Sequence, residues 1–385
     1  MSPSTVEPPK FVFLEKNALK IPKGPKGPSP YAEKLTEGPS YKQFPTPLKA
    51  SGKLDNEYKF DEITPHIGRE YPEAQLSEIV KDDDKIRDLA ITISRRGVVF
   101  FKAQDLSIED QKTLADKLGR LTGKPEKSTI HIHPTAPAGG VLNSNGSGQV
   151  DPEVSIISSK LQKQLTPKEF RHKKAGEGFH SDITFEPVPS DYAILKIVET
   201  PPTGGDTLWV SGYSLYEKLS PSFRAFLETL TGTYSQENFH KAAERGNFEI
   251  YAAERGAPEN VGEDLIAHHP IVRTNPVTGW RSVFSIGGHF TSFDGLTDDE
   301  TKLIKDYLQD LVVASHDIQV RKRWGKNDIA IWDNRSVYHS ATNDYFDDNI
   351  YERTGVRTVG IGERPYFDPT SKARSEDLHA SGLSV

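Results

Sequence analysis

The chain contains no cysteine among its 385 residues and only one methionine. The absence of cysteine excludes a disulfide framework, a thiolate metal site and a cysteine nucleophile, so any bound metal must sit on nitrogen and oxygen ligands. No apolar run is long enough to span a bilayer, and residues 1–9 carry no apolar signal core. A net charge of -7 leaves no basic excess for binding nucleic acid. We therefore expect a cytoplasmic protein with neither nucleic-acid nor membrane partners.

His180, Asp182 and the distant His339 form the pattern with the most chemical content. In an extended segment, residues i and i+2 point to the same side, so His180 and Asp182 can hold one ion. The apolar stretch 328–333 predicts a strand and turn that present His339. Two imidazoles and one carboxylate are the facial ligand set of non-haem Fe(II) oxygenases. An H-x-D pair also occurs by chance, so on these residues alone the alternative is a set of incidental polar side chains.

Two closely spaced arginines, at positions 353 and 357, lie downstream of the distal histidine. The planar guanidinium of Arg353 suits a bidentate contact with the carboxylate of a co-substrate. In a strand, Arg357 faces the same way as Arg353. The pattern thus predicts an oxygenase that depends on Fe(II) and 2-oxoglutarate. The alternative is a surface ion-pair cluster with the nearby acids Asp344, Asp347, Asp348 and Glu352.

The composition divides the chain into three parts. Residues 1–74 are rich in Pro, Lys and Gly, which predicts an extended arm without regular structure, either tied to the body or a neighbouring subunit, or disordered. Regular structure is expected from about Gln75. A catalytic domain over 75–370 and a polar tail over 371–385 complete the division.

Hydrophobic periodicity predicts short strands flanking a few helices. The expected helices are 84–95, 107–121 with a capping box at Ser107–Asp110, 214–230 with a restart at Ser220-Pro221, and 297–315. The expected strands include 98–101, 192–198 and 206–210. Candidate ligands at strand ends favour an α+β, mostly β, double-stranded β-helix (jelly roll) core with flanking helices.

Five separated blocks resemble the taurine / 2,4-dichlorophenoxyacetate dioxygenase family. They are GFHSDITFE (178–186), PPTGGDTLWVS (201–211), HPIVRTNPVTG (269–279), NDIAIWDNR (327–335) and ERTGVR (352–357). They occur in family order, and the resemblance covers roughly Gln75 to Phe367. The polar amino-terminal extension is most similar to that of fungal sulfonate dioxygenases.

The resemblance implies a role for each candidate residue. His180, Asp182 and His339 would bind Fe(II), and Thr207 with Arg353 would hold the distal carboxylate of 2-oxoglutarate. His133 and Arg357 would meet the anionic group of the substrate, and Phe239 and Phe290 would wall its pocket. A metal pair formed by His131 and His133 is the less favoured alternative, because no carboxylate accompanies it in the local sequence. His268, His269 and Arg273 are expected to be structural.

The implied reaction hydroxylates the carbon next to a sulfonate, in taurine or another alkyl sulfonate, giving sulfite and an aldehyde beside succinate and CO2. O2 and a small anionic substrate are the implied partners, and a homo-oligomer is expected. Three departures from the taurine pattern argue against strict taurine specificity: Ala136 replaces a family Tyr, Gly176-Glu177-Gly178 offers no Asn, and Phe179 replaces Trp.

The segment 140–179 is also longer than the resemblance requires, and its basic residues could form a lid or a solvated loop. They are Lys160, Lys163, Lys168, Arg171, His172, Lys173 and Lys174. Other substrates stay open: a sulfate ester, a carboxylate, an amino acid, a purine or a specialised metabolite. So does a non-catalytic metal-binding jelly roll.

Overall fold

A computed structural model describes residues 6–14, 19, 21–32, 46–144, 147–165, 174–345 and 352–382. The helices are α1 (Lys53–Glu57), α2 (Leu76–Ile79), α3 (Asp83–Arg96), α4 (Ile108–Arg120), α5 (Ser159–Leu165), α6 (Gly212–Lys218), α7 (Pro221–Leu227), α8 (Asn238–Gly246), α9 (Asp298–Ala314) and α10 (Arg374–Ala380). Short 3-10 turns are η1 (Ala136–Ala138), η3 (Ala175–Gly178) and η4 (His316–Ile318).

The strands up to the middle of the chain are β1 (Phe11–Phe13), β2 (Asp61–Glu62), β3 (Arg69–Tyr71), β4 (Val98–Phe101), β5 (Gly139–Leu142), β6 (Val150–Asp151), β7 (Ser155–Ser158), β8 (Ser190–Glu199) and β9 (Thr207–Ser211). The later strands are β10 (Thr231–Ser235), β11 (Ile266–Pro270), β12 (Val272–Thr274), β13 (Arg281–Val283), β14 (Phe290–Phe293), β15 (Gln319–Lys322), β16 (Ile329–Asp333), β17 (Val337–Ala341) and β18 (Thr354–Ile361).

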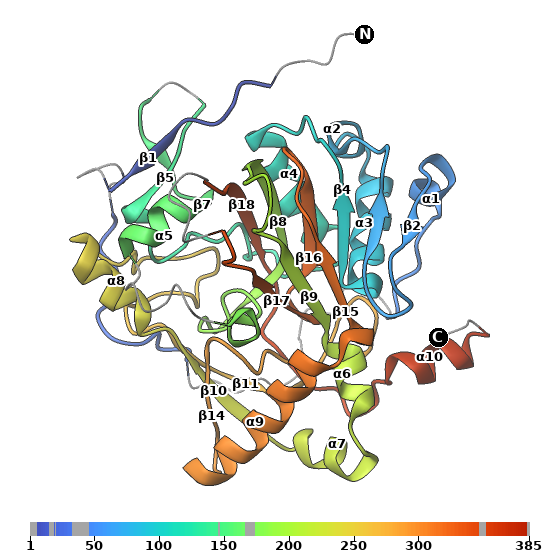
Figure 1. Ribbon diagram of the computed structural model, residues 1–385. Helices are drawn as coiled ribbons and strands as arrows, with labels where there is room; N and C mark the ends of the chain where they lie inside the picture. Colours follow the sequence, from blue (N-terminus) through green and yellow to red (C-terminus); the bar gives the residue numbers. More distant parts are fainter. Residues whose placement is uncertain are drawn as a thin grey trace.

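Two facing sheets form the jelly-roll core (Figure 1). The larger sheet has the order β2-β3-β4-β16-β8-β18-β7, and the smaller one has the order β15-β9-β17. Alternation along β16 shows which face is which. Ile329 and Ile331 pack with the core of α3 and α4, whereas Ala330 and Trp332 pack with Trp209 of the smaller sheet. Helices α3 and α4 therefore cover the outer face of the larger sheet, and His339 on β17 lies between the sheets, with its ring 4.9 Å from that of Trp332.

Most of the predicted elements are confirmed. The predicted helix 84–95 is α3, and the strand 98–101 is β4. The stretch 214–230 divides at Ser220, whose side chain accepts a hydrogen bond from the Phe223 amide at the start of α7. At α4 only half of the predicted capping box forms. Ser107 Oγ accepts from the Asp110 amide, but the Asp110 carboxylate accepts from that same hydroxyl rather than from the Ser107 amide.

The prediction that regular structure begins near Gln75 is wrong. The short helix α1 and the strands β2 and β3 precede that residue, and β3 pairs in parallel with β4 of the larger sheet. The apolar triplet of β1 pairs with β5, with Phe11 opposite Val141. Prolines interrupt the chain between these segments but do not prevent short stretches from pairing into the sheets.

The amino-terminal arm is tied to the body of the molecule where the structure describes it. The Glu263 amide donates to Gly27 O at 2.9 Å, and Ser29 Oγ donates to Glu259 O at 2.5 Å. At the other end, the tail predicted as polar contains α10, whose Leu378 is buried and whose Asp377 accepts from Trp280 Nε1 at 2.9 Å. In the described residues, no helix is both long and apolar enough to cross a membrane.

Candidate active site

His180, Asp182 and His339 come together in one cluster, as the sequence predicts. Their ligand atoms all lie within 4.8 Å of one another. Asp182 Oδ1 is 3.9 Å from His180 Nε2, and Asp182 Oδ2 is 3.8 Å from His339 Nε2. Metal–ligand bonds of about 2.0–2.2 Å allow two donors of one ion to be up to roughly 4.4 Å apart. Both separations therefore fit a shared metal ion.

Backbone pairing between distant segments positions the two imidazoles. His180 and His339 exchange amide–carbonyl hydrogen bonds of 3.1 and 2.8 Å, which fixes the loop before Asp182 against β17. His180 Nδ1 lies 2.8 Å from Gly178 O, so this nitrogen carries the proton and Nε2 keeps its lone pair for a metal. Burial lowers the pKa of His339 to about 3, so its imidazole is neutral at neutral pH.

The Asp182 carboxylate also fits a cation. Although burial opposes its ionisation, the neighbouring Arg357 guanidinium holds the pKa of this carboxyl well below its usual range. Arg357 Nη1 donates to Oδ1 at 2.5 Å. The other oxygen, Oδ2, is buried and has no hydrogen-bond partner among the described residues. A buried anionic oxygen without a partner is costly, and a metal ion bound beside the two imidazoles would satisfy it.

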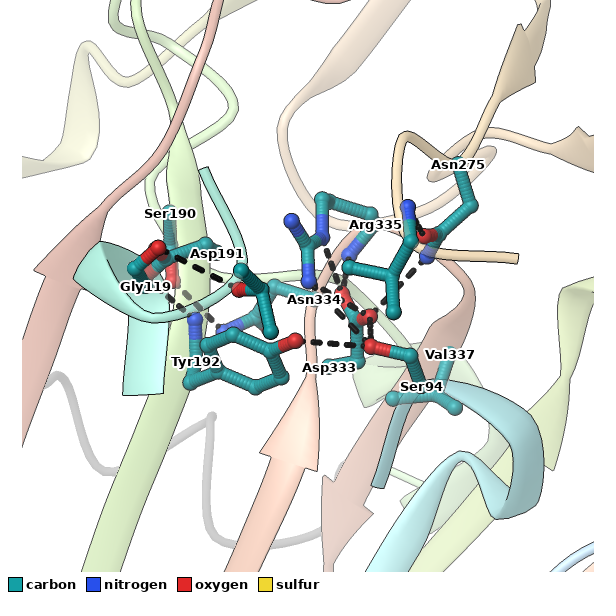
Figure 2. Close-up of polar contacts among 12 residues, drawn as sticks. Ser94, Gly119, Ser190, Asp191, Tyr192, Asn275, Asp333, Asn334, Arg335 and Val337 are labelled. Atoms are coloured by element: carbon teal, nitrogen blue, oxygen red, sulfur yellow. Dashed lines mark hydrogen bonds and ion pairs between the residues drawn. The ribbon is translucent and has the colours of Figure 1, made fainter. Parts of the chain in front are cut away.

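Asn334 anchors Asp182 to the turn between β16 and β17. Its Oδ1 accepts from the Asp182 amide and from Trp332 Nε1, each at 2.9 Å, and its Nδ2 donates to Ser190 Oγ at 2.8 Å. Asp333, the last residue of β16, accepts hydrogen bonds from Arg335, Ser94 Oγ and Asn275 Nδ2, as Figure 2 shows. These buried contacts hold the turn that leads to His339.

Thr207 and Arg353 are adjacent, as the resemblance implies. Arg353 Nη2 donates to Thr207 Oγ1 at 3.2 Å, and its Nε donates to Gly205 O at 2.8 Å. Trp324 Nε1 also donates to Thr207 Oγ1, at 3.0 Å. The two acceptors of the buried Arg353 guanidinium, Gly205 O and Thr207 Oγ1, are uncharged, so its positive charge is available to a carboxylate. Strand β9 pairs Trp209 with His339, so Thr207 lies roughly 6.6 Å further along the same face.

A cavity of about 650 Å³ opens beside the cluster. Its inner end exposes His180, Asp182 and Arg357, together with His133 and His289. Strand β7 and helices α5 and α8 form the wall further out. The two helices contact each other and lie side by side in Figure 1. Its lining residues there are Ile156, Ile157, Ser158, Leu161, Gln162, Leu165, Asn238, Phe239, Lys241, Ala242 and Arg245.

His133 lines this cavity as a neutral hydrogen-bond donor. Its Nδ1 accepts from the Thr135 amide at 3.2 Å, which leaves the ring proton on Nε2. Burial, assisted by the positive charge of Arg357, moves its pKa well below the ordinary histidine value. Its ring lies 4.9 Å from that of Phe239, so these two predicted pocket residues do meet. The alternative pairing with His131 as a metal site gains no support, because His131 Nε2 faces Glu186 at 3.4 Å.

The expectation that Phe290 walls the substrate pocket is wrong for the described cavity. Its ring is buried in the core beside β10, with centroids 5.5 Å from Tyr234 and 4.7 Å from Phe293, and it does not belong to the described cavity lining. The neighbouring His289 points into the cavity instead, and its Nδ1 lies 2.9 Å from Thr184 Oγ1. Alternation along an extended segment puts adjacent side chains on opposite faces, so a one-residue shift exchanges core and pocket.

The remaining candidates divide between structural roles and undescribed positions. His269 Nε2 donates to Thr184 O at 2.9 Å, and Arg273 forms a buried ion pair with Glu363, so both are structural as expected. Of the basic residues predicted as a lid or loop, Lys160 and Lys163 belong to α5. The others on that segment, apart from Lys174, lie outside the described residues: Lys168, Arg171, His172 and Lys173. Asp347 and Asp348 lie outside them too.

Several site residues escaped the sequence analysis. Asn334 stands in the quoted NDIAIWDNR block, but nothing in the block shows that its side chain reaches Asp182. The α5 and α8 wall depends on two helices separated by more than seventy residues, and no local pattern joins them. The signal available for Asn334 was its position directly after the predicted strand that ends at Asp333.

Comparisons with known proteins agree with this site. The family model described as taurine catabolism dioxygenase TauD, TfdA family matches residues 59–359. The alpha-ketoglutarate-dependent dioxygenase btcD of Neocamarosporium betae is 44% identical over 348 residues, covering 86% of this chain and 98% of that protein. The alpha-ketoglutarate-dependent sulfonate dioxygenase of Saccharomyces cerevisiae is 28% identical, covering 88% and 77%.

A solved structure shows the same fold. The crystal structure of a taurine dioxygenase from Burkholderia xenovorans superposes with a TM-score of 0.60 at 26% identity, covering 82% of this chain and 92% of that one. The family match spans most of the chain and includes the whole His–Asp–His cluster. The chain therefore belongs to the TauD/TfdA family, and it is an Fe(II)- and 2-oxoglutarate-dependent dioxygenase.

Proposed function

We propose that this dioxygenase hydroxylates an organic anion, with a sulfonate as the favoured head group, at a carbon held beside the iron. The observation that carries the proposal is the composition of the inner cavity. The metal cluster, the Arg357 cation and the neutral His133 donor border the same space. A sulfonate is fully ionised at neutral pH and offers three oxygens to such converging donors.

Each residue has a distinct proposed role. His180, Asp182 and His339 hold Fe(II), and Arg353 with Thr207 binds the distal carboxylate of 2-oxoglutarate. When bound, the iron supplies the oxidative chemistry that couples decarboxylation of 2-oxoglutarate to hydroxylation of the substrate. Arg357 Nη1 donates to Asp182 Oδ1, which keeps that carboxylate ionised, and the remaining donors of the guanidinium meet the anionic head group of the substrate. His133 donates from Nε2 to the substrate head group, and Phe239 packs against the substrate and excludes water.

The overall reaction balances without a further reductant. One oxygen atom of O2 enters succinate, the other enters the substrate as a hydroxyl group, and CO2 leaves from 2-oxoglutarate. Where the hydroxylated carbon bears a sulfonate, its C–S bond breaks with the electron pair leaving on sulfite. The hydroxyl proton is lost as the carbon becomes an aldehyde.

The comparisons bear on the substrate in two directions. The yeast relative is named for sulfonates, which supports that head group. The more similar btcD carries no substrate in its name. A related oxygenase acting on a sulfate ester, amino acid, purine or specialised metabolite is therefore the second candidate, and the departures at Ala136 and Gly176–Gly178 favour it over a strict taurine enzyme.

A coupled assay tests the proposal. The protein is loaded with Fe(II) and 2-oxoglutarate and offered sulfonates, sulfate esters, carboxylates and neutral analogues of matched size, while succinate and sulfite are measured together. We expect succinate formation to rise with anionic substrates and sulfite to appear only with sulfonates. Stimulation by neutral analogues alone, with no sulfite from any sulfonate, would contradict the proposal and support the second candidate.

A further inference from the structure

We propose that the wall formed by α5 and α8 selects an organic anion with a large apolar body, rather than a two-carbon sulfonate such as taurine. This inference rests on the proposed function and names the class of substrate that the same cavity accepts. The anionic head lies at the iron, and a ring system or alkyl chain extends along the two helices. Taurine offers only two methylenes and a charged amine to this wall.

The size of the cavity is the first observation. Its volume of about 650 Å³ lies within the range of roughly 300–1,000 Å³ that is typical of pockets for drug-sized ligands. A molecule as small as taurine would leave most of that space to water. A ligand that fills the space gains the burial of its own apolar surface and of the surface that lines the cavity.

The distribution of polarity is the second observation. The charged and hydrogen-bonding groups His133, Arg357 and His289 gather at the inner end. The rings of Phe185 and Phe239 pack against His289 and His133 at this inner end. Along α5 and α8 the lining includes the aliphatic side chains of Leu161, Leu165 and Ala242, with the uncharged polar side chains of Gln162 and Asn238 between them. The cationic and donor groups at the inner end suit an anionic head group, and the aromatic and aliphatic side chains beyond it suit an apolar body. The exposed Lys241 and Arg245 lie at the cavity's solvent edge.

The apolar wall is tied to the proposed co-substrate clamp. Ser159, at the start of α5, and Arg353 are joined by two bonds: the Ser159 amide donates to Arg353 O at 3.0 Å, and the Arg353 amide donates to Ser159 Oγ at 3.1 Å. At the other end of α5, Arg245 of α8 donates from Nε to Leu165 O at 2.8 Å. The two helices therefore form one wall, anchored beside Arg353 of the proposed co-substrate clamp.

A series of linear alkyl sulfonates tests the inference directly. Ethane-, propane-, butane-, hexane- and octanesulfonate are compared with taurine in the coupled succinate and sulfite assay, using the iron-loaded full chain. Burial of one methylene contributes about 0.8 kcal/mol, so KM is expected to fall about fourfold for each carbon until the wall is covered. A KM that is flat from taurine to octanesulfonate would overturn the inference.

Two cavity variants and a surface control assign the effect to the wall. Ala242→Phe on α8 should shorten the pocket, raising KM for octanesulfonate at least tenfold while KM for ethanesulfonate changes less than twofold. Leu161→Ala should move the optimum to a longer chain. Glu244→Phe adds the same ring at an exposed position of α8 and should change neither value. Equal responses of Ala242→Phe and Glu244→Phe would remove α8 from the selection.

The assay distinguishes failure of the proposed substrate class from failure of the inference about the α5 and α8 wall. If the sulfonate series stimulates succinate formation without any dependence on chain length, the proposed function stands and the inference about the wall is wrong. If no anion of any length stimulates succinate formation, while Fe(II) and 2-oxoglutarate still bind, the proposed substrate class fails. Loss of the length dependence in Ala242→Phe with unchanged 2-oxoglutarate affinity supports both.

Discussion

At the scale of single residues, the proposed metal ligands depend on a side chain that does not touch the metal. The amide oxygen of Asn334 holds the Asp182 backbone, and the same side chain bridges to Ser190 on β8. Groups that orient metal ligands through hydrogen bonds typically account for 10–100-fold in metal affinity. Asn334 therefore acts as a positioning residue.

Replacing Asn334 by Leu should weaken Fe(II) binding about tenfold to a hundredfold. The change keeps the volume but leaves the Asp182 and Trp332 donors buried without an acceptor, at a cost of about 1–3 kcal/mol each. Metal affinity is measured by anaerobic titration, and stability by denaturant unfolding. Asn275→Leu is the matched control, because Asn275 bonds to Asp333 in the same network without touching Asp182. Equal iron affinities in the two variants would contradict the positioning role.

Arg353 carries the second prediction at this scale. Arg353→Leu should raise the apparent constant for 2-oxoglutarate by about one to three orders of magnitude, because it removes a buried bidentate donor. Arg353→Lys should recover only part of the loss, since an ammonium group cannot reproduce the two parallel bonds. Initial rates against 2-oxoglutarate concentration measure the effect. The exposed Arg323→Leu serves as the control, and a similar 2-oxoglutarate constant in all three variants would place the clamp elsewhere.

At the scale of elements, periodicity identified the parts of the fold in which burial follows the local pattern. Strand β4 is buried at all four positions, and α3 begins at a side-chain cap on Asp82 and ends before Gly97. Strands β1, β2 and β3 were not predicted, because they are short and gain their stability from pairing with distant partners. Local sequence carries no information about such partners.

Strand β8 contains a buried lysine that predicts a pH effect on stability. Lys196 Nζ donates a hydrogen bond to the carbonyl oxygen of Leu106 at 2.9 Å. Burial lowers the pKa of this lysine to about 8. The unfolded chain therefore holds more protons than the folded protein between about pH 8 and the ordinary lysine pKa of 10.5. The contribution of Lys196 to the free energy of unfolding therefore increases as pH rises through that window.

The difference between the wild type and Lys196→Met isolates this group. The free energy of unfolding of the wild type should rise relative to that of the variant between pH 7.5 and pH 9.5. Denaturant unfolding at the two pH values measures the change, and all other titrating groups cancel in the difference. A difference that is the same at both pH values would show that the Lys196 pKa is not lowered in the folded protein.

At the scale of the whole molecule, we expect the core to fold without a metal at the proposed site. The two histidine segments pair through their backbones, and Arg357 compensates the Asp182 charge. Removal of metal by a chelator should therefore leave the far-ultraviolet circular dichroism spectrum unchanged. Adding Mn(II) at 100 times its dissociation constant should stabilise the protein by about 2.7 kcal/mol. Unfolding on chelation would contradict this separation of site and core.

The sequence predicted the chemistry of the site better than its shape. The clustering of His180, Asp182 and His339 could be predicted because ligand types and spacing constrain a metal site strongly. Thr207 and Arg353 followed from the resemblance, and they are adjacent in the structure. The prediction that Phe290 lines the pocket was wrong because the neighbouring His289 faces the described cavity instead. The α5 and α8 wall could not be foreseen, because it arises from the packing of two distant helices. The expected homo-oligomer stays a prediction.

The ultraviolet–visible absorbance of the protein with Fe(II) and 2-oxoglutarate, recorded without oxygen, tests the central claim most directly. If His180, Asp182 and His339 hold the iron and the open positions take 2-oxoglutarate, a charge-transfer band should appear in the wild type. It should persist in His316→Ala, a histidine change outside the cluster, and be lost in His339→Ala. An undiminished band in His339→Ala, at the same metal and co-substrate concentrations, would contradict the assignment of this cluster as the iron site.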